Sequence, residues 1–160
     1  MMTRQTFGER AAIFLATGCG VGFSPVAPGT VGTLLGIPLA WGVAQLPGVA
    51  LQGVVVVLVA LAGIPICTRA AAALGGKKDP GSIVLDEIAS LPMTFFLIPL
   101  SDWRVIVAGY LLHRLFDITK PPPARQLELL PDGLGIMADD WIAGLYSNLS
   151  LRLLILLNML

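Results

Sequence analysis

The sequence predicts an all-α protein, a polytopic membrane helical bundle with about four to five transmembrane helices and a short N-terminal interfacial helix. The mean hydropathy is +0.84, and 56% of the 160 residues are hydrophobic while only 12% are charged. That balance is far from the composition of a soluble domain, and the apolar stretches are long enough to enter a bilayer. With no internal repeat or interdomain linker, residues 1–160 are expected to form a single integral-membrane domain.

The apolar segments follow one another along the chain. Residues 11–23 are rich in glycine and too short to span comfortably, which favours an interfacial helix. The predicted spans are residues 31–46, 49–67, 88–100, 104–118 and 141–160. A helix of thirteen residues covers only about 20 Å. The shorter spans are therefore expected to extend into their charged flanks or to lie in a locally thinned bilayer.

Basic residues gather on one side of the predicted bundle. If the spans alternate, the long loops 68–87 and 119–140 share one face with the segment before residue 31. The basic residues of that face are Arg4, Arg10, Arg69, Lys77, Lys78, Arg114, Lys120 and Arg125. The other face has only Arg104, apart from Arg152 within the last span. Because an excess of Lys and Arg marks the cytoplasmic side, the charged loops are predicted to be cytoplasmic.

Five carboxylates stand at the ends of these apolar segments. They are Asp86, Glu87, Asp117, Asp139 and Asp140, and all fall on the predicted cytoplasmic face. Ionised side chains near hydrocarbon are costly, and five acids together repel one another unless a cation neutralises them. The pattern predicts one divalent-metal site at the membrane surface. The alternative is that each acid only compensates a helix dipole or caps a helix.

Two further patterns are suited to a phosphate group. Prolines and glycines of residues 24–33 form a loop at a helix start, where N–H groups and the hydroxyls of Thr30 and Thr33 could hold phosphate. The alternative is a Pro-Gly turn with Thr30 as N-cap. Arg114, Asp117 and Lys120 are spaced by three and share a helical stripe, which suits a phosphomonoester or, alternatively, a salt-bridge ladder. The proline run after Lys120 should end that helix.

Composition and missing motifs exclude several functions. Ten basic and ten acidic residues give no excess charge for nucleic acid. The cysteines Cys19 and Cys67 form no disulfide framework. Neither cysteine has an arginine six positions later, His113 is the single histidine, and no Asp-x-Asp nucleophile pattern occurs. Metal-assisted hydrolysis by water remains, and a small ion-coupled membrane transporter is the alternative from another class, because intramembrane acids also mark ion pathways.

Four strings in order carry a resemblance to a known family. They are Ser-Pro-x-x-Pro-Gly-Thr-x-Gly-Thr at 24–33, Asp-x-Gly-x-Ile-Val-x-Asp-Glu at 79–87, Arg-x-x-Asp-x-x-Lys-Pro-x-Pro at 114–123 and Gly-x-Gly-Ile-Met-x-Asp-Asp-x-x-Ala-Gly at 133–144. Over roughly residues 11–146 the chain resembles the phosphatidylglycerophosphatase A family. The resemblance implies a magnesium-dependent phosphatase of the bacterial inner membrane that converts phosphatidylglycerophosphate to phosphatidylglycerol and inorganic phosphate.

The expected site follows from the motifs and this resemblance. The five acids are expected to be catalytic and to hold Mg²⁺, while Thr30, Thr33, Arg114 and Lys120 bind the substrate phosphate. The expected partners are the lipid substrate and the bilayer, with the active site facing the cytoplasm. Three departures are Ser90, where a glycine commonly stands, His113, in place of an aromatic or aliphatic residue, and Ala124, where a bulkier apolar residue is common. They leave another lipid phosphate open as the substrate.

Overall fold

The computed structural model describes residues 5–76, 78 and 80–160. Arg4 and Lys77, which belong to the predicted basic face, and Asp79 of the second motif lie outside the described residues. Among the described residues there are seven α-helices, one short 3₁₀ helix and no strand, which confirms the predicted all-α class. The helices are α1 (Phe7–Ala16), η1 (Val21–Phe23), α2 (Pro28–Ala44), α3 (Val49–Ala73), α4 (Leu85–Thr94), α5 (Trp103–Thr119), α6 (Ala124–Leu127) and α7 (Asp132–Leu156).

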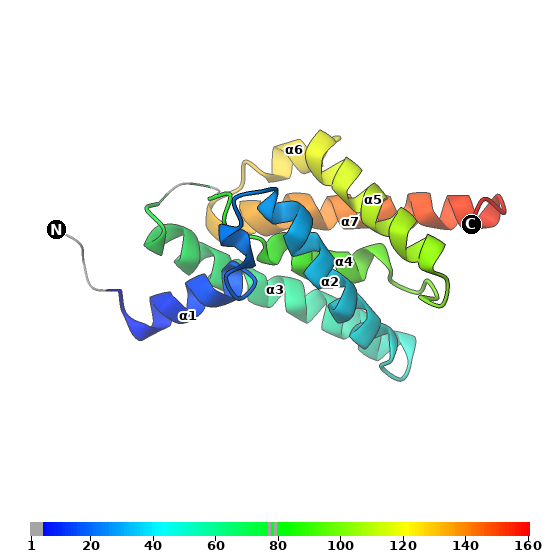
Figure 1. The fold of residues 1–160 in the computed structure, drawn as a ribbon, viewed down its shortest axis with the longest axis horizontal. Helices are drawn as coiled ribbons and strands as arrows, with labels where there is room; N and C mark the ends of the chain where they lie inside the picture. The colour runs from blue at the N-terminus through cyan, green and yellow to red at the C-terminus, as the bar shows by residue number, and fades with distance from the viewer. Residues whose placement is uncertain (1–4, 77, 79) are drawn as a thin grey trace.

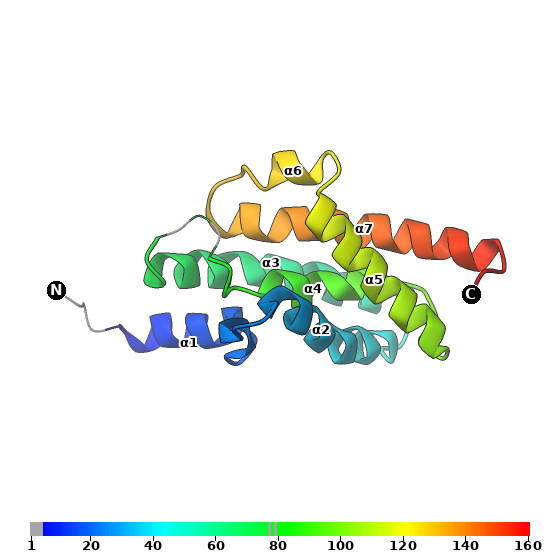
Figure 2. The same ribbon diagram turned by 45° about the horizontal axis from the view of Figure 1, so that its top comes forward.

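The short helix α4 lies at the centre of the bundle. It packs against α2, α3, α5 and α7, and seven of its ten residues are buried. The two longest helices, α3 and α7, run roughly along the long axis of the molecule and pack against each other as well as against α4, while α5 crosses α7 obliquely (Figures 1 and 2). A residue on α4 is therefore within reach of four other helices.

Glycines allow α2 to approach α4 closely. A Cβ at Gly32 would lie 2.6 Å from Val84 Cβ, and one at Gly36 would lie 2.8 Å from Leu91 Cβ. Small residues at such a crossing let two helix backbones come together. Gly32 of the first motif therefore brings the start of α2 beside the N-terminus of α4 at Val84, and Gly36 continues the close contact to Leu91.

The last helix begins earlier than the hydropathy pattern predicted. The predicted span was 141–160, with Asp139 and Asp140 opening it, but α7 begins at Asp132. The two acids therefore lie inside the helix, beyond its first turn. Gly133 reads as a helix breaker, yet a Cβ there would lie 2.1 Å from the Ile64 carbonyl oxygen. The glycine is needed for contact with α3 and is retained within the helix.

Other predicted boundaries are also corrected. The predicted span 88–100 is helical only to Thr94, because α4 begins at Leu85 and the chain turns at Leu97, whose φ is 58°. The predicted interfacial segment 11–23 divides into α1, which ends at Ala16, and η1. The N-cap of α2 is Ala27 rather than Thr30. The end of α5 at Thr119, with Lys120 as C-cap, confirms the stop expected before the proline run.

Within the described part of the chain, one helix is long and apolar enough to cross a membrane. It is α3, residues Val49–Ala73. Helix α2 is apolar but shorter. The predicted set of four to five crossings accordingly stays a prediction.

Candidate active site

Three of the five predicted carboxylates form a compact group. Asp86 and Glu87 lie in the first turn of α4, and Asp140 reaches them from α7. Each can offer an oxygen, and these atoms lie within 4.8 Å of one another. The residues are only 9%, 8% and 2% exposed, respectively. We call them the acid group.

The acid group has unmet bonding capacity. Among the described residues, Asp86 Oδ1, Glu87 Oε2 and Asp140 Oδ2 are buried without a hydrogen-bond partner. Burial, reinforced by the neighbouring acids, raises the pKa of Asp86 and of Asp140 well above their usual range. Burial likewise raises the pKa of Glu87 to about 7. Converging carboxylate oxygens that lack partners are the ligands a hard divalent cation prefers, so the residues fit Mg²⁺.

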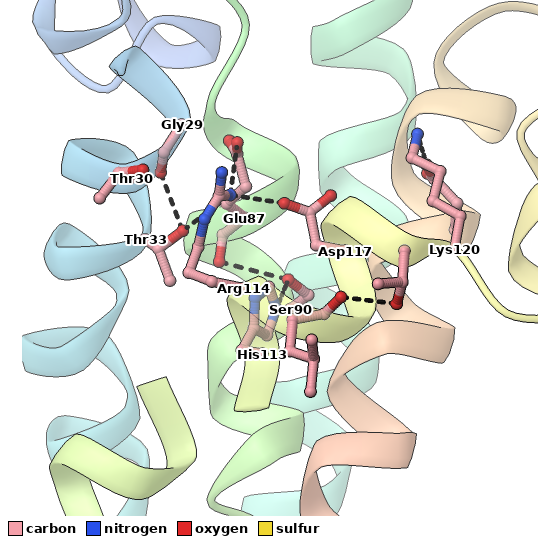
Figure 3. A network of polar contacts seen from close by, with 12 residues as sticks. Gly29, Thr30, Thr33, Glu87, Ser90, His113, Arg114, Asp117 and Lys120 are labelled. Atoms are coloured by element: carbon pink, nitrogen blue, oxygen red, sulfur yellow. Dashed lines mark hydrogen bonds and ion pairs between the residues drawn. The ribbon is translucent and has the colours of Figure 1, made fainter. Parts of the chain in front are cut away.

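Asp117 lies beside the acid group and is held by an arginine. Arg114 Nη1 forms ion pairs with Asp117 and, at 3.4 Å, with Glu87 Oε1. The same nitrogen donates to Thr33 Oγ1 at 3.5 Å (Figure 3). The charge of Asp117 contributes to the raised pKa of both Glu87 and Asp140. Arg114 therefore ties α5 to α4 and α2 at the edge of the acid group.

Asp139 is held by a second cation. Lys120 Nζ lies 2.7 Å from Asp139 Oδ2 and 3.2 Å from Glu128 Oε1. Partial burial lowers the pKa of Lys120, but the two carboxylates outweigh burial and leave that pKa above its ordinary value. Sequence reasoning placed Lys120 at the site but missed Glu128, since a lone acid in a charged loop carries no pattern.

The N-terminus of α2 completes this end of the bundle. A Cβ at Gly29 would lie 2.2 Å from Glu87 Oε1, so only glycine allows this approach. Thr33 Oγ1 donates to the Gly29 carbonyl oxygen at 2.8 Å and is buried. The Thr30 carbonyl accepts a hydrogen bond from Tyr110 at 3.1 Å. The loop predicted to bind phosphate thus lies against Glu87 and Arg114.

A buried pair behind the site was not predicted. Ser90 Oγ and His113 Nε2 are hydrogen-bonded at 2.8 Å, and neither residue is exposed (Figure 3). Ser90 Oγ also lies 3.2 Å from the carbonyl oxygen of Glu87. Ser90 and His113 are two of the three departures noted in the sequence, and the structure brings them into contact. The occurrence of both departures in one chain was the sequence signal that could have predicted this contact.

The fold and the site define a class: an all-helical protein with a buried acid group, bordered by an arginine, a lysine and a helix N-terminus. Such a site suits a divalent cation and a phosphate group. The family model described as phosphatidylglycerophosphatase A matches residues 14–155, and the chain belongs to this family. The resemblance predicted from the four motifs is confirmed. The prediction that the chain is an enzyme, a phosphoric monoester hydrolase, is confirmed with it.

Curated relatives agree with the family match. The chain is 39% identical over 134 residues to phosphatidylglycerophosphatase A of Escherichia coli strain K12, covering 83% of this chain and 77% of that protein. It is 40% identical over 134 residues to the protein of the same name from Haemophilus influenzae, covering 83% and 82%.

A third relative has a different name. A Bacteroides thetaiotaomicron protein, provisionally named a phosphatidylinositol-3-phosphatase, is 38% identical over 143 residues, covering 84% of this chain and 87% of its own. No solved structure matches the chain. Relatives at similar identity thus differ in the head group that their names specify.

Proposed function

We propose that the chain is a magnesium-dependent phosphatidylglycerophosphatase of phospholipid biosynthesis. It removes the terminal phosphate of phosphatidylglycerophosphate and releases phosphatidylglycerol and inorganic phosphate. The observation that carries the proposal is the buried acid group beside Arg114, in which three oxygens have no hydrogen-bond partner in the part of the chain that the structure describes. Family membership and the names of two relatives support the substrate.

Asp86, Glu87 and Asp140 would hold Mg²⁺, with Asp117 and Asp139 completing the acidic set. A bound cation supplies positive charge against the phosphoryl oxygens and makes water more acidic. Without it, every member of the acid group that is ionised would repel an anionic substrate. The cation therefore also makes the site accessible to a phosphate.

The chain's own residues bind and orient the phosphoryl group. The hydrogen bonds of Arg114 among the described residues all use Nη1, so the Nη2 donors of the guanidinium remain for phosphoryl oxygens. Lys120 supplies a second positive charge, and the first turn of α2 supplies backbone N–H groups beside Glu87. These groups stabilise the charge that develops during phosphoryl transfer. One of the carboxylates orients the attacking water.

The membrane placement is part of the proposal. We place the chain in the bacterial inner membrane as a multi-pass protein with its active site at the cytoplasmic face. Many large apolar side chains of α3 are exposed, among them Val54, Leu58 and Leu61, as expected for contact with lipid. The basic residues near the site, including Arg125 and Lys120, agree with a cytoplasmic location. The matched relatives with this family name are bacterial.

Phosphate release from phosphatidylglycerophosphate tests the proposal. Purified protein in detergent should release phosphate with Mg²⁺ and not with chelator, and Asp86→Ala or Asp139→Ala should abolish release without reducing expression. Release that persists in both variants would remove the metal-ligand assignment. No release from well-folded wild-type protein would overturn the substrate.

The third relative favours a second candidate, a phosphatase of another lipid phosphate. Parallel assays with a phosphatidylinositol phosphate distinguish the two. A kcat/KM for that lipid equal to or above the value for phosphatidylglycerophosphate would establish the second candidate.

A further inference from the structure

A charged pocket opens beside the acid group, between α6 and the first half of α7. Its volume is about 410 Å³. Buried Gly135 and Ile136 lie at its wall, and Asp139 is shared between this pocket and the candidate active site. Its rim carries two exposed cations, Lys78 and Arg125. None of the predicted phosphate-binding residues lines it.

The two carboxylates of the pocket form ion pairs, whereas its two cations do not within the described residues. Its two carboxylates, Asp139 and Glu128, both pair with Lys120, which bridges them at 2.7 and 3.2 Å. Neither Lys78 nor Arg125 has an acid partner within residues 5–76, 78 and 80–160. The pocket thus holds two available cations that the proposed cleavage site does not use. Cations with a shared concave surface and no acid partner favour an anionic ligand.

The substrate of the proposed function has a second anion to place. Phosphatidylglycerophosphate carries the terminal monoester and also a phosphodiester, one glycerol unit away, that links the head group to the diacylglycerol. When the monoester lies at the acid group, the diester must lie a short distance to one side. The pocket adjoins the candidate active site at Asp139, and its cations Lys78 and Arg125 could bind the diester on that side.

We propose that this pocket is an anion subsite for the head-group phosphodiester, in which Lys78 and Arg125 bind the diester oxygens. The assignment rests on the proposed function and names a determinant of its substrate specificity. A lipid phosphate that lacks a diester would gain nothing from these residues. The subsite contributes to binding of substrate and product equally, and it therefore affects KM rather than kcat.

The two reaction products probe the two subsites separately. Inorganic phosphate competes only at the cleavage site, whereas phosphatidylglycerol retains the diester and competes at the pocket. In Lys78→Ala and Arg125→Ala, each lost contact should raise KM by about tenfold, which corresponds to about 1.4 kcal/mol. The Ki of phosphatidylglycerol in mixed micelles should rise by a similar factor. The kcat and the Ki of inorganic phosphate should stay within about twofold of wild type.

Matched variants separate the subsite from general charge effects. Arg69→Ala removes one exposed cation of α3 that does not line the pocket, and it should leave KM unchanged. Lys78→Arg and Arg125→Lys keep the charge and should retain most of the affinity for the lipid.

Three results would overturn the proposal. An unchanged KM in the double variant Lys78→Ala/Arg125→Ala would remove the subsite and leave the proposed function standing. A parallel rise in the Ki of inorganic phosphate would assign the two cations to the cleavage site instead. If wild-type protein releases no phosphate from phosphatidylglycerophosphate, the proposed function fails, and the subsite assignment falls with it.

Discussion

Asp140 shows what burying acids together means for a single residue. It is 2% exposed, and the charges of Asp117, Glu87 and Asp139 all act on it. A carboxylate in such surroundings costs free energy of folding unless a cation balances it. We therefore expect the charge of Asp140 to be needed for activity but to lower the free energy of unfolding when no metal is bound.

Asp140→Asn should separate these two effects. The amide keeps the shape but removes a charge, so phosphate release should fall at least about 100-fold, as when a transition-state contact is lost. The melting temperature of the metal-free protein should rise by about 2–4 °C. Assay and thermal unfolding on the same preparation check both changes. Asp132→Asn, an exposed position on the same helix, is the control and should change neither.

The Ser90–His113 pair fixes α5 against α4 one residue before Arg114. His113→Phe keeps the ring volume but leaves Ser90 Oγ without this partner. The free energy of unfolding should fall by about 1–3 kcal/mol, as for other buried hydrogen bonds that lose one side. Denaturant unfolding measures the change. The double variant Ser90→Ala/His113→Phe removes both polar groups without placing a glycine inside α4 and should recover part of the loss; no recovery would show that the two residues act separately.

Helix α2 allows a direct test of the close contact with Glu87, because it contains one glycine at that contact and another that faces open space. Gly29→Ala should displace the Glu87 carboxylate, whose Oε1 lies 2.2 Å from the added Cβ, and should lower kcat/KM at least about tenfold. Gly42→Ala meets nothing within 4 Å. It should leave activity unchanged and stabilise the protein by about 0.5–1 kcal/mol, because alanine suits a helix interior better than glycine. Equal activity in both variants would contradict the contact.

Helix boundaries show where sequence reasoning succeeded and where it failed. The end of α5 was predictable because prolines at 121–123 act locally. The start of α7 was not, because Gly133 and Gly135 look like breakers until the carbonyls that they approach, at Ile64 and Leu130, are known. The convergence of Asp86, Glu87 and Asp140 followed from the charge pattern. The sequence did not show which acids pair with a cation. That Asp117 pairs with Arg114 and Asp139 with Lys120 depends on side-chain geometry.

For the whole molecule, the acid group is expected to link stability to pH and, under the proposed function, to Mg²⁺. The pKa of Glu87 rises from 4.5 to about 7 on folding, and burial shifts Asp86 and Asp140 in the same direction. The folded state therefore binds more protons than the unfolded state, and their contribution to stability is lost as pH rises from about 4.5 through 7. The increase in melting temperature that saturating Mg²⁺ produces should be small at pH 5 and larger at pH 8. Thermal scans with and without Mg²⁺ measure it.

The variant Asp86→Asn/Glu87→Gln/Asp140→Asn is the control for this linkage. It lacks the three carboxyl groups whose pKa is raised, and Mg²⁺ should increase its melting temperature by the same small amount at both pH values. A large response that persists in this variant would place the cation elsewhere in the molecule.

The number of helices need not equal the number of membrane crossings. Helix α4 has ten residues, which rise about 15 Å, half of a hydrocarbon layer of about 30 Å. Beyond it, Asn148 donates to the carbonyls of Thr94 and Phe96, and Arg152 donates to that of Phe96. Backbone without helical partners is tolerated at membrane depth where protein satisfies it. Together with six further residues, which can reach about 20 Å, this helix and the turn after it have the length of a predicted bilayer crossing. Arg152 is the one charged side chain of the last predicted span, and it holds the Phe96 end of this segment against α7.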